Sequence, residues 1–232
     1  MRYYMGDLEG GKKAGRAAVD LARAIGDPVL LGECLVSMGL VGDPPTRKAI
    51  YQEALAVTSR SGDLIWTAWS HNNLGDALLV ENDLEAAKQH LQQARTILRE
   101  VGHPSPQPVA NLGWVHLRQG NLDKANAAFT EALRDSERLH HRLVASVAIL
   151  GLACNAIARH DWERAARLLG FADGELQDYA GSWPALERSY REQSLTDLER
   201  QLGTEFERYY DSGRAGDRSE LIDYALDQRH IP

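Results

Sequence analysis

The chain has 232 residues, of which 44% are hydrophobic and 25% are charged, the ordinary balance of a folded soluble protein. It lacks the alternating segments rich in Val, Ile and Thr that strands require, which argues against an extensive β-sheet. The 26 Lys and Arg residues stand against 33 Asp and Glu residues, and the net charge of -7 disfavours an autonomous nucleic-acid binder.

The N-terminal segment already carries the spacing of a helical repeat. Ala18 to Gly26 repeats the spacing of Ala54 to Gly62 and of Ala94 to Gly102, and Gly6-Asp7 resembles the turn that precedes such a helix. The chain therefore opens near the end of the first helix of a repeat. This predicts either a piece of a longer protein or a protein without that first helix.

A weak copy of the repeat follows. Leu35, Tyr51 and Ala54 keep the spacing, and Gly42-Asp43-Pro44-Pro45 forms the expected turn, although Arg47 occupies a position that is Ala in the other copies. Two prolines suit the first turn of a helix, where the missing N–H groups have no partner to lose. We expect a helix on each side of this turn.

Three stronger copies fill the middle of the chain with a period of 38 to 40 residues. Each starts at a small residue, namely Gly75, Gly113 or Ala153, and has Ala 12 residues later, a large apolar residue 16 residues later and a second Ala 19 residues later. A polar turn lies between the small residue and the first Ala. The later landmarks are Ala87, Leu91 and Ala94, then Ala125, Phe129 and Ala132, then Ala165, Leu169 and Ala172. The turns are Glu81-Asn82-Asp83, Gln119-Gly120-Asn121 and Arg159-His160-Asp161.

This pattern predicts stacked helical hairpins. Apolar residues recur at three- and four-residue spacing, which is typical of amphipathic helices. The small residues stand where the two helices of a hairpin would cross closely, and Asp83, Asn121 and Asp161 stand where an N-cap is expected. One hairpin cannot bury its apolar face alone, so neighbouring hairpins stack. The uncharged stretch from Leu143 to Ala158 is too short for a bilayer and predicts a buried helix.

The last quarter of the chain lacks the Ala landmarks. A charged helix is predicted from Trp183-Pro184 to Leu202, with shorter helices near Thr204–Asp211 and Arg218–Asp227. Terminal repeats need a polar outer face. We therefore expect an array over residues 1–181, with a partial first repeat and about four hairpins, and a helical cap over 182–232. A partner site in the cap is the alternative.

The landmarks resemble those of tetratricopeptide (TPR) repeats, and the long period resembles the class found in kinesin light chains and bacterial regulators. A narrower resemblance lies further along: Glu163-Arg164-Ala165-Ala166-Arg167-Leu168-Leu169-Gly170 and the Trp-Pro helix start are similar to the TPR tails of bacterial signal-transduction ATPases. These include the maltose-activator-like and antibiotic-regulator-like transcription factors. The same order continues with Leu202-Gly203, Phe206, Gly213-Arg214-Ala215 and Tyr224-Ala225-Leu226. The resemblance implies an all-α fold, a right-handed TPR solenoid.

Chemical sites are poorly supported by the sequence. Gly6 to Lys12 fits a phosphate-binding loop, but Lys13 replaces the expected Ser/Thr and no apolar strand precedes it. Cys34 and Cys154 indicate a reducing cytoplasm and suit buried positions. The histidines are scattered and suit solvated or capping positions, and the charges after Arg188 suit a solvated helix face. We expect no enzyme, no cofactor, no metal, no direct nucleic-acid contact and no membrane segment.

The resemblance also implies a ligand-binding groove on the first helices of the hairpins. The groove slots lie six, three and two residues before the small landmark, and one and five residues after it. An Asn two residues before the landmark often bonds an extended peptide backbone in the family, and its amide offers both donor and acceptor. Packing between helices is the competing interpretation. The slots are Trp69, Asn72, Asn73, Asp76 and Val80, then Gln107, Ala110, Asn111, Trp114 and Arg118.

These observations favour a non-catalytic scaffold that binds a protein or peptide, as the sensor or interaction region of a bacterial transcriptional regulator in the cytoplasm. The alternative is a domain that senses a small-molecule inducer, for which a closed aromatic pocket beside Trp69 and Trp114 would be the sign. A homo-oligomer is a further possibility.

Overall fold

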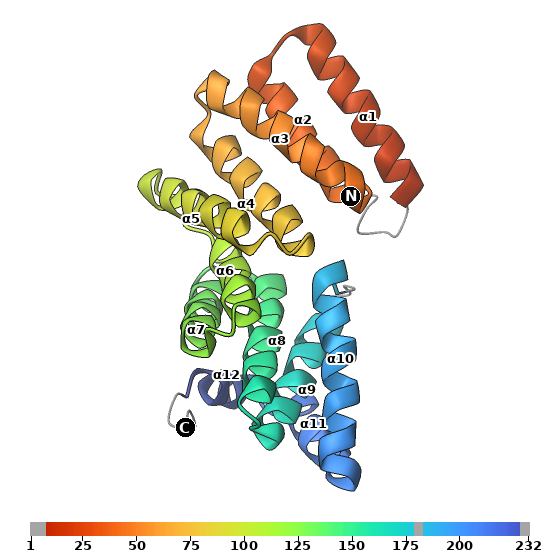
Figure 1. The fold of residues 1–232 in the computed structure, drawn as a ribbon, viewed down its shortest axis with the longest axis vertical. Coiled ribbons are helices and arrows are strands. Elements are labelled where there is room, and N and C mark those ends of the chain that lie inside the picture. Colours follow the sequence, from red (N-terminus) through yellow and green to blue (C-terminus); the bar gives the residue numbers. More distant parts are fainter. Residues whose placement is uncertain (1–7, 179–182, 228–232) are drawn as a thin grey trace. The chain divides into compact units, whose positions relative to one another are not determined.

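The computed structural model describes residues 8–178 and 183–227, which form α-helices joined by short turns and contain no β-strand (Figure 1). The predicted all-α class is confirmed. The chain divides into two compact units, residues 1–111 and 112–232, and the division falls within α6 (Gln107–Arg118). The other helices of the first unit are α1 (Leu8–Ile25), α2 (Pro28–Val41), α3 (Pro44–Ser61), α4 (Leu64–Val80) and α5 (Leu84–Glu100). Those of the second are α7 (Leu122–Arg138), α8 (Arg142–Ala158), α9 (Trp162–Asp178), α10 (Ala185–Leu202), α11 (Phe206–Arg214) and α12 (Arg218–Leu226), with a 3₁₀ turn at Gly203–Glu205.

Consecutive helices pack against one another within each unit. In the first unit α1 packs on α2, α2 on α3, α3 on α4 and α4 on α5, and in the second α7 packs on α8 and α8 on α9. Because the connecting turns are only a few residues long, each helix packs antiparallel against the one before it. The result is an all-α TPR-like solenoid arrangement of helical hairpins.

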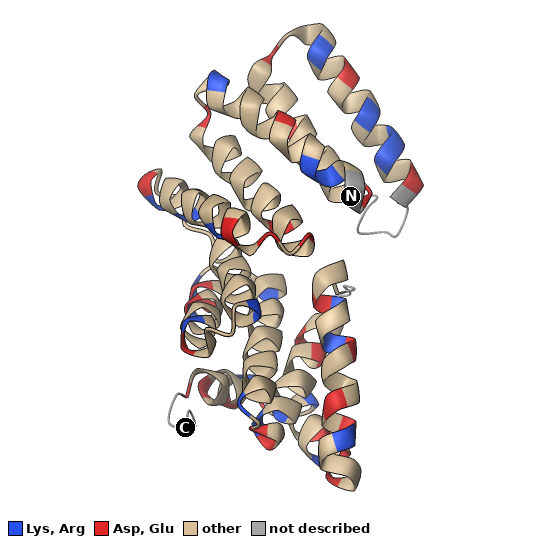
Figure 2. Cartoon of the chain, viewed as in Figure 1, with Lys and Arg blue, Asp and Glu red and all other residues tan. Residues whose placement is uncertain are grey.

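The repeat landmarks form the core of the hairpins. The first Ala of each strong copy, Ala87, Ala125 and Ala165, is fully buried, and the large residues Leu91 and Phe129 are buried as completely. The central helix α8 is buried along most of its length, as its uncharged sequence predicts, and carries almost no charged residue (Figure 2).

Close approach of the two helices in a hairpin explains the small landmark residue. A Cβ atom on Gly75 would lie 2.7 Å from Cγ of Leu91, and one on Gly113 would lie 2.5 Å from Cε1 of Phe129. Atoms at these distances overlap, so any side chain at the Gly position would push the helices apart.

The polar turns share one backbone conformation. Their middle residues, Asn82, Gly120 and His160, adopt positive φ angles of 63°, 71° and 61°. Asp83 and Asp161 then cap the following helices as predicted, accepting hydrogen bonds from the N–H groups of residues 86 and 164 at 3.3 Å each. Asn121 occupies the same position, but its amide instead donates to Gln119 at 3.3 Å.

The C-terminal helices are attached to α9. Gly170 of α9 and Gly213 of α11 face the backbone of the opposite helix so closely that neither site has room for a Cβ atom. Asp173 of α9 accepts hydrogen bonds from Nε of Arg191 on α10 at 2.6 Å and from the hydroxyl of Tyr210 on α11 at 2.7 Å. The expected boundary between array and cap, at 181/182, lies outside the described residues and stays a prediction.

Candidate binding face

The predicted groove residues of α4 differ in burial and in their contacts, and Trp69 and Asp76 are partly buried. Trp69 packs against the apolar cluster formed by α1, α2 and α3. Burial raises the pKa of Asp76, an effect that the charge of Arg47 partly offsets. Part of the Trp69 ring is therefore buried by packing against this cluster. The Asp76 carboxyl group is largely shielded from water.

Three amide side chains in the first unit are joined by hydrogen bonds. Nδ2 of Asn111 donates to Oδ1 of Asn72 at 3.3 Å, and Nδ2 of Asn72 donates to Oδ1 of Asn73 at 2.9 Å. Asn72 and Asn111 are each 2% exposed, whereas Asn73 is only partly buried. Of these three amides, only that of Asn73 is accessible to a ligand. Asn72 donates a hydrogen bond to Asn73 and accepts one from Asn111, which fixes the orientation of the Asn73 side chain.

Gln107 begins α6, and its backbone N–H donates to Oγ of Ser105 at 3.3 Å. Its side chain is partly buried. This hydrogen bond stabilises the turn before α6, directly before Gln107, which is the first predicted groove residue of that helix.

The remaining predicted residues, Trp114 and Arg118, meet a side chain from α10. The Trp114 ring stacks on the ring of Tyr190 at a centroid distance of 4.4 Å and an angle of 17°, and contacts Phe129 edge-on at 5.0 Å. Nε of Arg118 donates to the Tyr190 hydroxyl at 2.7 Å. Trp114 is fully buried as a result, so a ligand could touch it only if Tyr190 moved away.

The structure thus brings the predicted residues together in two groups. Asn72, Asn73 and Asn111 are connected in the first unit, and Trp114 and Arg118 converge on Tyr190 in the second. One continuous face through both groups stays a prediction.

Tyr190 was not predicted. The sequence carries a signal for it, because Tyr190, Ser194 and Leu198 follow at four-residue spacing, and Ser194 and Leu198 are buried. The charges around them obscured this stripe. The charged face itself is not uniformly solvated either, since Arg191 pairs with Asp173 and Arg188 donates to the backbone oxygen of Trp183.

The same slot spacing can be applied to the weak repeat, with Leu35 as its landmark. It assigns five residues to the groove side of α2. Val29, Glu33 and Leu40 are exposed, whereas Gly32 and Val36 are buried. The exposed fractions are 37% for Val29 and 45% for Leu40, and Val80 on α4 is 43% exposed. Helices α2 and α4 lie side by side, so these apolar side chains belong to neighbouring helices.

Two histidines are not solvated, contrary to the expectation. Nδ1 of His71 on α4 and Nδ1 of His90 on α5 lie 2.8 Å apart, and both rings are partly buried. Burial lowers the pKa of His71 to about 4, with a smaller contribution from the charge of His90, and burial also lowers the pKa of His90. The pair is therefore neutral at pH 7 and joins the two helices of one hairpin.

The cysteines are poor nucleophiles in this fold. Cys154 is buried, and desolvation raises its pKa to about 12. Cys34 is partly buried, and desolvation followed by the charge of Glu33 raises its pKa. Within the described ranges, no three His, Cys, Asp or Glu side chains are placed to hold a metal ion.

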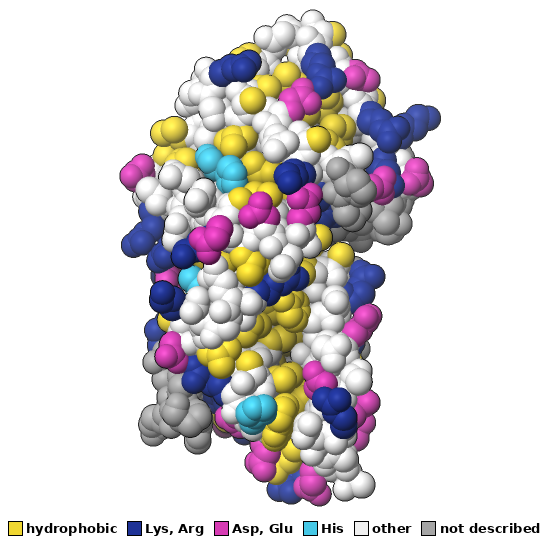
Figure 3. Space-filling view, viewed as in Figure 1, with side chains coloured by type: hydrophobic (Ala, Val, Ile, Leu, Met, Phe, Trp, Pro, Cys, Tyr) yellow, Lys and Arg dark blue, Asp and Glu magenta, His cyan; other side chains and the backbone are white. Residues whose placement is uncertain are grey.

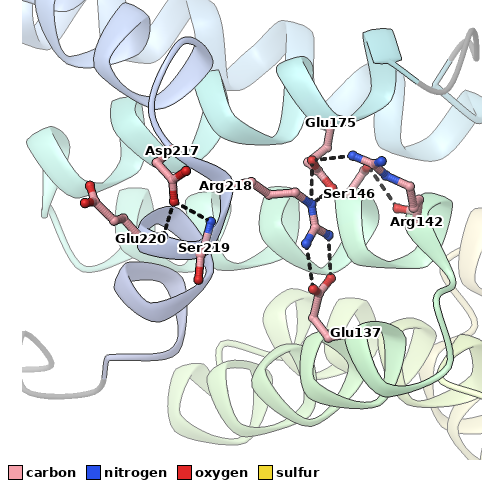
Figure 4. A network of polar contacts seen from close by, with 8 residues as sticks. All are labelled: Glu137, Arg142, Ser146, Glu175, Asp217, Arg218, Ser219 and Glu220. Carbon is pink, nitrogen blue, oxygen red and sulfur yellow. Dashed lines mark hydrogen bonds and ion pairs between the residues drawn. The ribbon is translucent and has the colours of Figure 1, made fainter.

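A charged cluster beneath α12 is already paired (Figure 4). Arg218 donates through both terminal nitrogens to Glu137, at 2.8 and 2.6 Å, and through Nε to Glu175 at 3.0 Å. Arg142 donates to the same Glu175 at 2.9 Å. The bonds to Glu137 and then to Glu175 raise the pKa of Arg218. The two guanidinium groups therefore form ion pairs with the two carboxylates, and these pairs attach α12 to α7, α8 and α9.

The surface of the described residues has hollows in both units. One of about 180 Å³ lies between α9 and the segment from Gly213 to Leu221, and its wall includes the paired Glu175 and Arg218. The other, along the start of α1, is lined by Glu9, Gly10, Lys12, Lys13 and Arg16. Neither includes Trp69 or Trp114.

The phosphate-loop-like motif is helical where it is described. Residues 8–12 belong to α1, and Nζ of Lys12 pairs with Asp43 at 2.8 Å and with Glu9 at 3.1 Å. Gly6 and Asp7, which complete the motif and the predicted first turn, lie outside the described residues.

Across the described ranges, every helix is too short or too polar to traverse a lipid bilayer. Known proteins are similar to this chain both in sequence and in structure. Residues 48–100 match the family described as tetratricopeptide repeat. Among solved structures, that of BtubC (BKLC) from P. vanneervenii is similar, with a TM-score of 0.62 and 19% identity over 97% of this chain and 94% of that chain. No curated protein matches in sequence. Residues 48–100 are therefore similar to a tetratricopeptide repeat, and the chain has an all-α helical-repeat fold.

Proposed function

We propose that the chain is a non-catalytic scaffold that binds an extended peptide of a partner protein on the groove side of α2 and α4. The observation that carries the proposal is the exposure of Val29, Leu40 and Val80, all of which fall in groove slots. Large apolar side chains on neighbouring helices that remain open to water are typical of interaction surfaces. In Figure 3, hydrophobic side chains of the first unit reach the surface in one view.

Polar groups beside these side chains define the chemistry of the peptide. Asn73 is held by Asn72 through its Oδ1 atom, and in residues 8–178 and 183–227 its Nδ2 group has no acceptor. This group suits a peptide carbonyl oxygen. Glu33 is exposed, and Asp76 gains ionisation if a cation approaches. The expected ligand is an extended segment with apolar side chains and a basic one.

The wider setting follows from the C-terminal resemblance. The scaffold would serve as the interaction region of a cytoplasmic bacterial transcriptional regulator, alone or as a homo-oligomer. The inducer-sensing alternative has less support, because the Trp114 ring is stacked on Tyr190 rather than open to a ligand and Trp69 lines neither of the two hollows.

A peptide library displayed on phage provides the test. Peptides selected on the full chain should be apolar with at least one Lys or Arg. Their affinity, measured by fluorescence anisotropy, should fall at least tenfold for Leu40→Glu and for Val80→Glu, because each places a charge in an apolar contact. Asn73→Ala should weaken binding about fivefold through the loss of one hydrogen bond.

Leu139→Glu is the matched control. Leu139 is 38% exposed, lies in the turn between α7 and α8 and does not occupy a groove slot. Its substitution should leave the affinity unchanged. Equal affinities for the α2 and α4 variants and the wild type would contradict the proposal.

A further inference from the structure

Helix α10 presents one stripe of side chains to the helices of the second unit. Tyr190 stacks on Trp114 of α6 and accepts a hydrogen bond from Arg118 of the same helix at 2.7 Å. One turn further on, Oγ of Ser194 lies 3.5 Å from Sγ of Cys154 on α8. Leu198, a further turn on, is fully buried.

The residues under this stripe are groove slots. Trp114 and Cys154 each follow the small landmark of their repeat by one position, and Arg118 follows Gly113 by five. Helix α10 thus covers, in the second unit, slots equivalent to Asp76 and Val80, which no such helix covers in the described part of the first unit.

The fit of α10 is incomplete in one respect. Nε1 of Trp114 is buried and has no hydrogen-bond partner among the described residues. A buried donor without an acceptor loses its hydration and gains nothing in return. An occupant that offered an oxygen atom at this point would satisfy the indole N–H while keeping the aromatic stack.

The remaining side chains of α10 would allow this helix to detach from α6 and α8. Half of its side chains are exposed, many of its residues are charged (Figure 2), and its buried residues are Glu187, Ser194 and Leu198. Outside the stripe, Nε of Arg191 donates to Asp173 and Arg188 donates to the backbone oxygen of Trp183. In the view of Figure 3, hydrophobic side chains reach the surface over α8, beside α10.

We propose that the face formed by Trp114, Arg118 and Cys154 is a helix-binding surface that α10 occupies within the chain and that an amphipathic helix of a partner protein can take over. The partner helix carries an aromatic residue, a small residue four positions later and Leu four positions after that, with an oxygen acceptor beside the aromatic ring for Trp114. This surface is separate from the α2 and α4 face, and the two proposals can fail independently.

The test uses a fluorescent synthetic peptide of residues 184–203 and the full chain. In a chain with Tyr190→Ala, the internal helix loses its aromatic contact, so the peptide should bind at least tenfold more tightly than it binds the wild type. A peptide that itself carries Tyr190→Ala and Leu198→Ala is the control and should not bind. Hydrogen exchange should show faster exchange of α10 amides in the Tyr190→Ala chain.

A locked chain provides the second arm. Ser194→Cys, in a Cys34→Ser background and refolded with oxidised glutathione, allows the introduced thiol to form a disulfide with Cys154; the two thiol hydrogens reduce glutathione disulfide. The peptide should bind the reduced form and lose at least tenfold in affinity for the oxidised form, with recovery on reduction. Equal binding to both forms, or no binding to the Tyr190→Ala chain, would overturn the proposal.

Discussion

Single residues with a left-handed backbone conformation end several of the helices and begin the turn to the next helix. The turns between repeats end α1, α3 and α5 with Gly26, Gly62 and Gly102, at φ angles of 79°, 76° and 70°. After α7 the same place holds His140 at a φ of 55°. A left-handed conformation strains a residue with a Cβ atom, whereas glycine adopts it without strain.

His140→Gly should therefore stabilise the protein by about 0.5–1 kcal/mol, the relief of strain less the greater flexibility of glycine in the unfolded chain. Urea denaturation followed by circular dichroism measures this. His141→Gly is the control, because His141 has a φ of -98° and should gain nothing. A loss of stability in His140→Gly would show that the ring makes a contact worth more than the strain.

The histidine pair predicts a pH dependence. The pKa of His71 is about 4 in the folded protein against about 6.5 in an unfolded chain, so the unfolded state binds more protons between these values. The free energy of unfolding should then fall as the pH drops from about 6.5 to about 4. In His71→Gln this contribution disappears, and the curve should be flatter than that of the wild type over the same window. Parallel curves in denaturation series at several pH values would contradict this.

At the scale of the helix, the periodicity of the sequence was sufficient to predict which residues are buried. The Ala and Leu landmarks lie at fixed offsets, and each is buried because a helix repeats its face every three to four residues. The helices predicted near 204–211 and 218–227 also lie close to the observed ones, α11 at Phe206–Arg214 and α12 at Arg218–Leu226.

Ala87→Leu tests the register of a hairpin. Ala87 is fully buried, and its backbone oxygen would lie 3.2 Å from a Cβ atom on Gly75, so the crossing has no room for a larger side chain. The substitution should cost about 1–3 kcal/mol. Gln89→Leu, on the exposed side of the same helix, should change the denaturation midpoint little. An unchanged midpoint for Ala87→Leu would mean that the assigned crossing is wrong.

Side-chain contacts between distant elements were beyond the sequence. Trp114 was expected in an open groove, but its partner Tyr190 comes from 76 positions later and buries it. Asn111 was expected to meet a peptide, but it bonds Asn72, 39 residues earlier, the length of one repeat. A spacing rule tells which face of a helix a residue occupies, whereas burial depends on which other segment covers that face.

At the scale of the whole molecule, each unit combines a helical-repeat core with a different use of the groove slots. In the first unit, exposed apolar residues lie on α2 and α4, and α4 also carries Asn72 and Asn73 of the three linked amides. In the second, α10 lies over slots of α6 and α8, and ionic contacts through Asp173, Glu175 and Arg218 attach the C-terminal helices. The repeat pattern predicted the core of both units, but only the structure distinguishes an open face from a covered one.

Hydrogen exchange with mass spectrometry on the full chain, with and without a library-selected peptide, tests the central claim of a peptide-binding face most directly. Bound peptide should slow exchange in α2 and α4 and leave α11 and α12 unchanged, because a ligand protects the backbone of the elements that it contacts. Protection confined to α1 and α5, or to α11 and α12, with none in α2 and α4, would contradict the account.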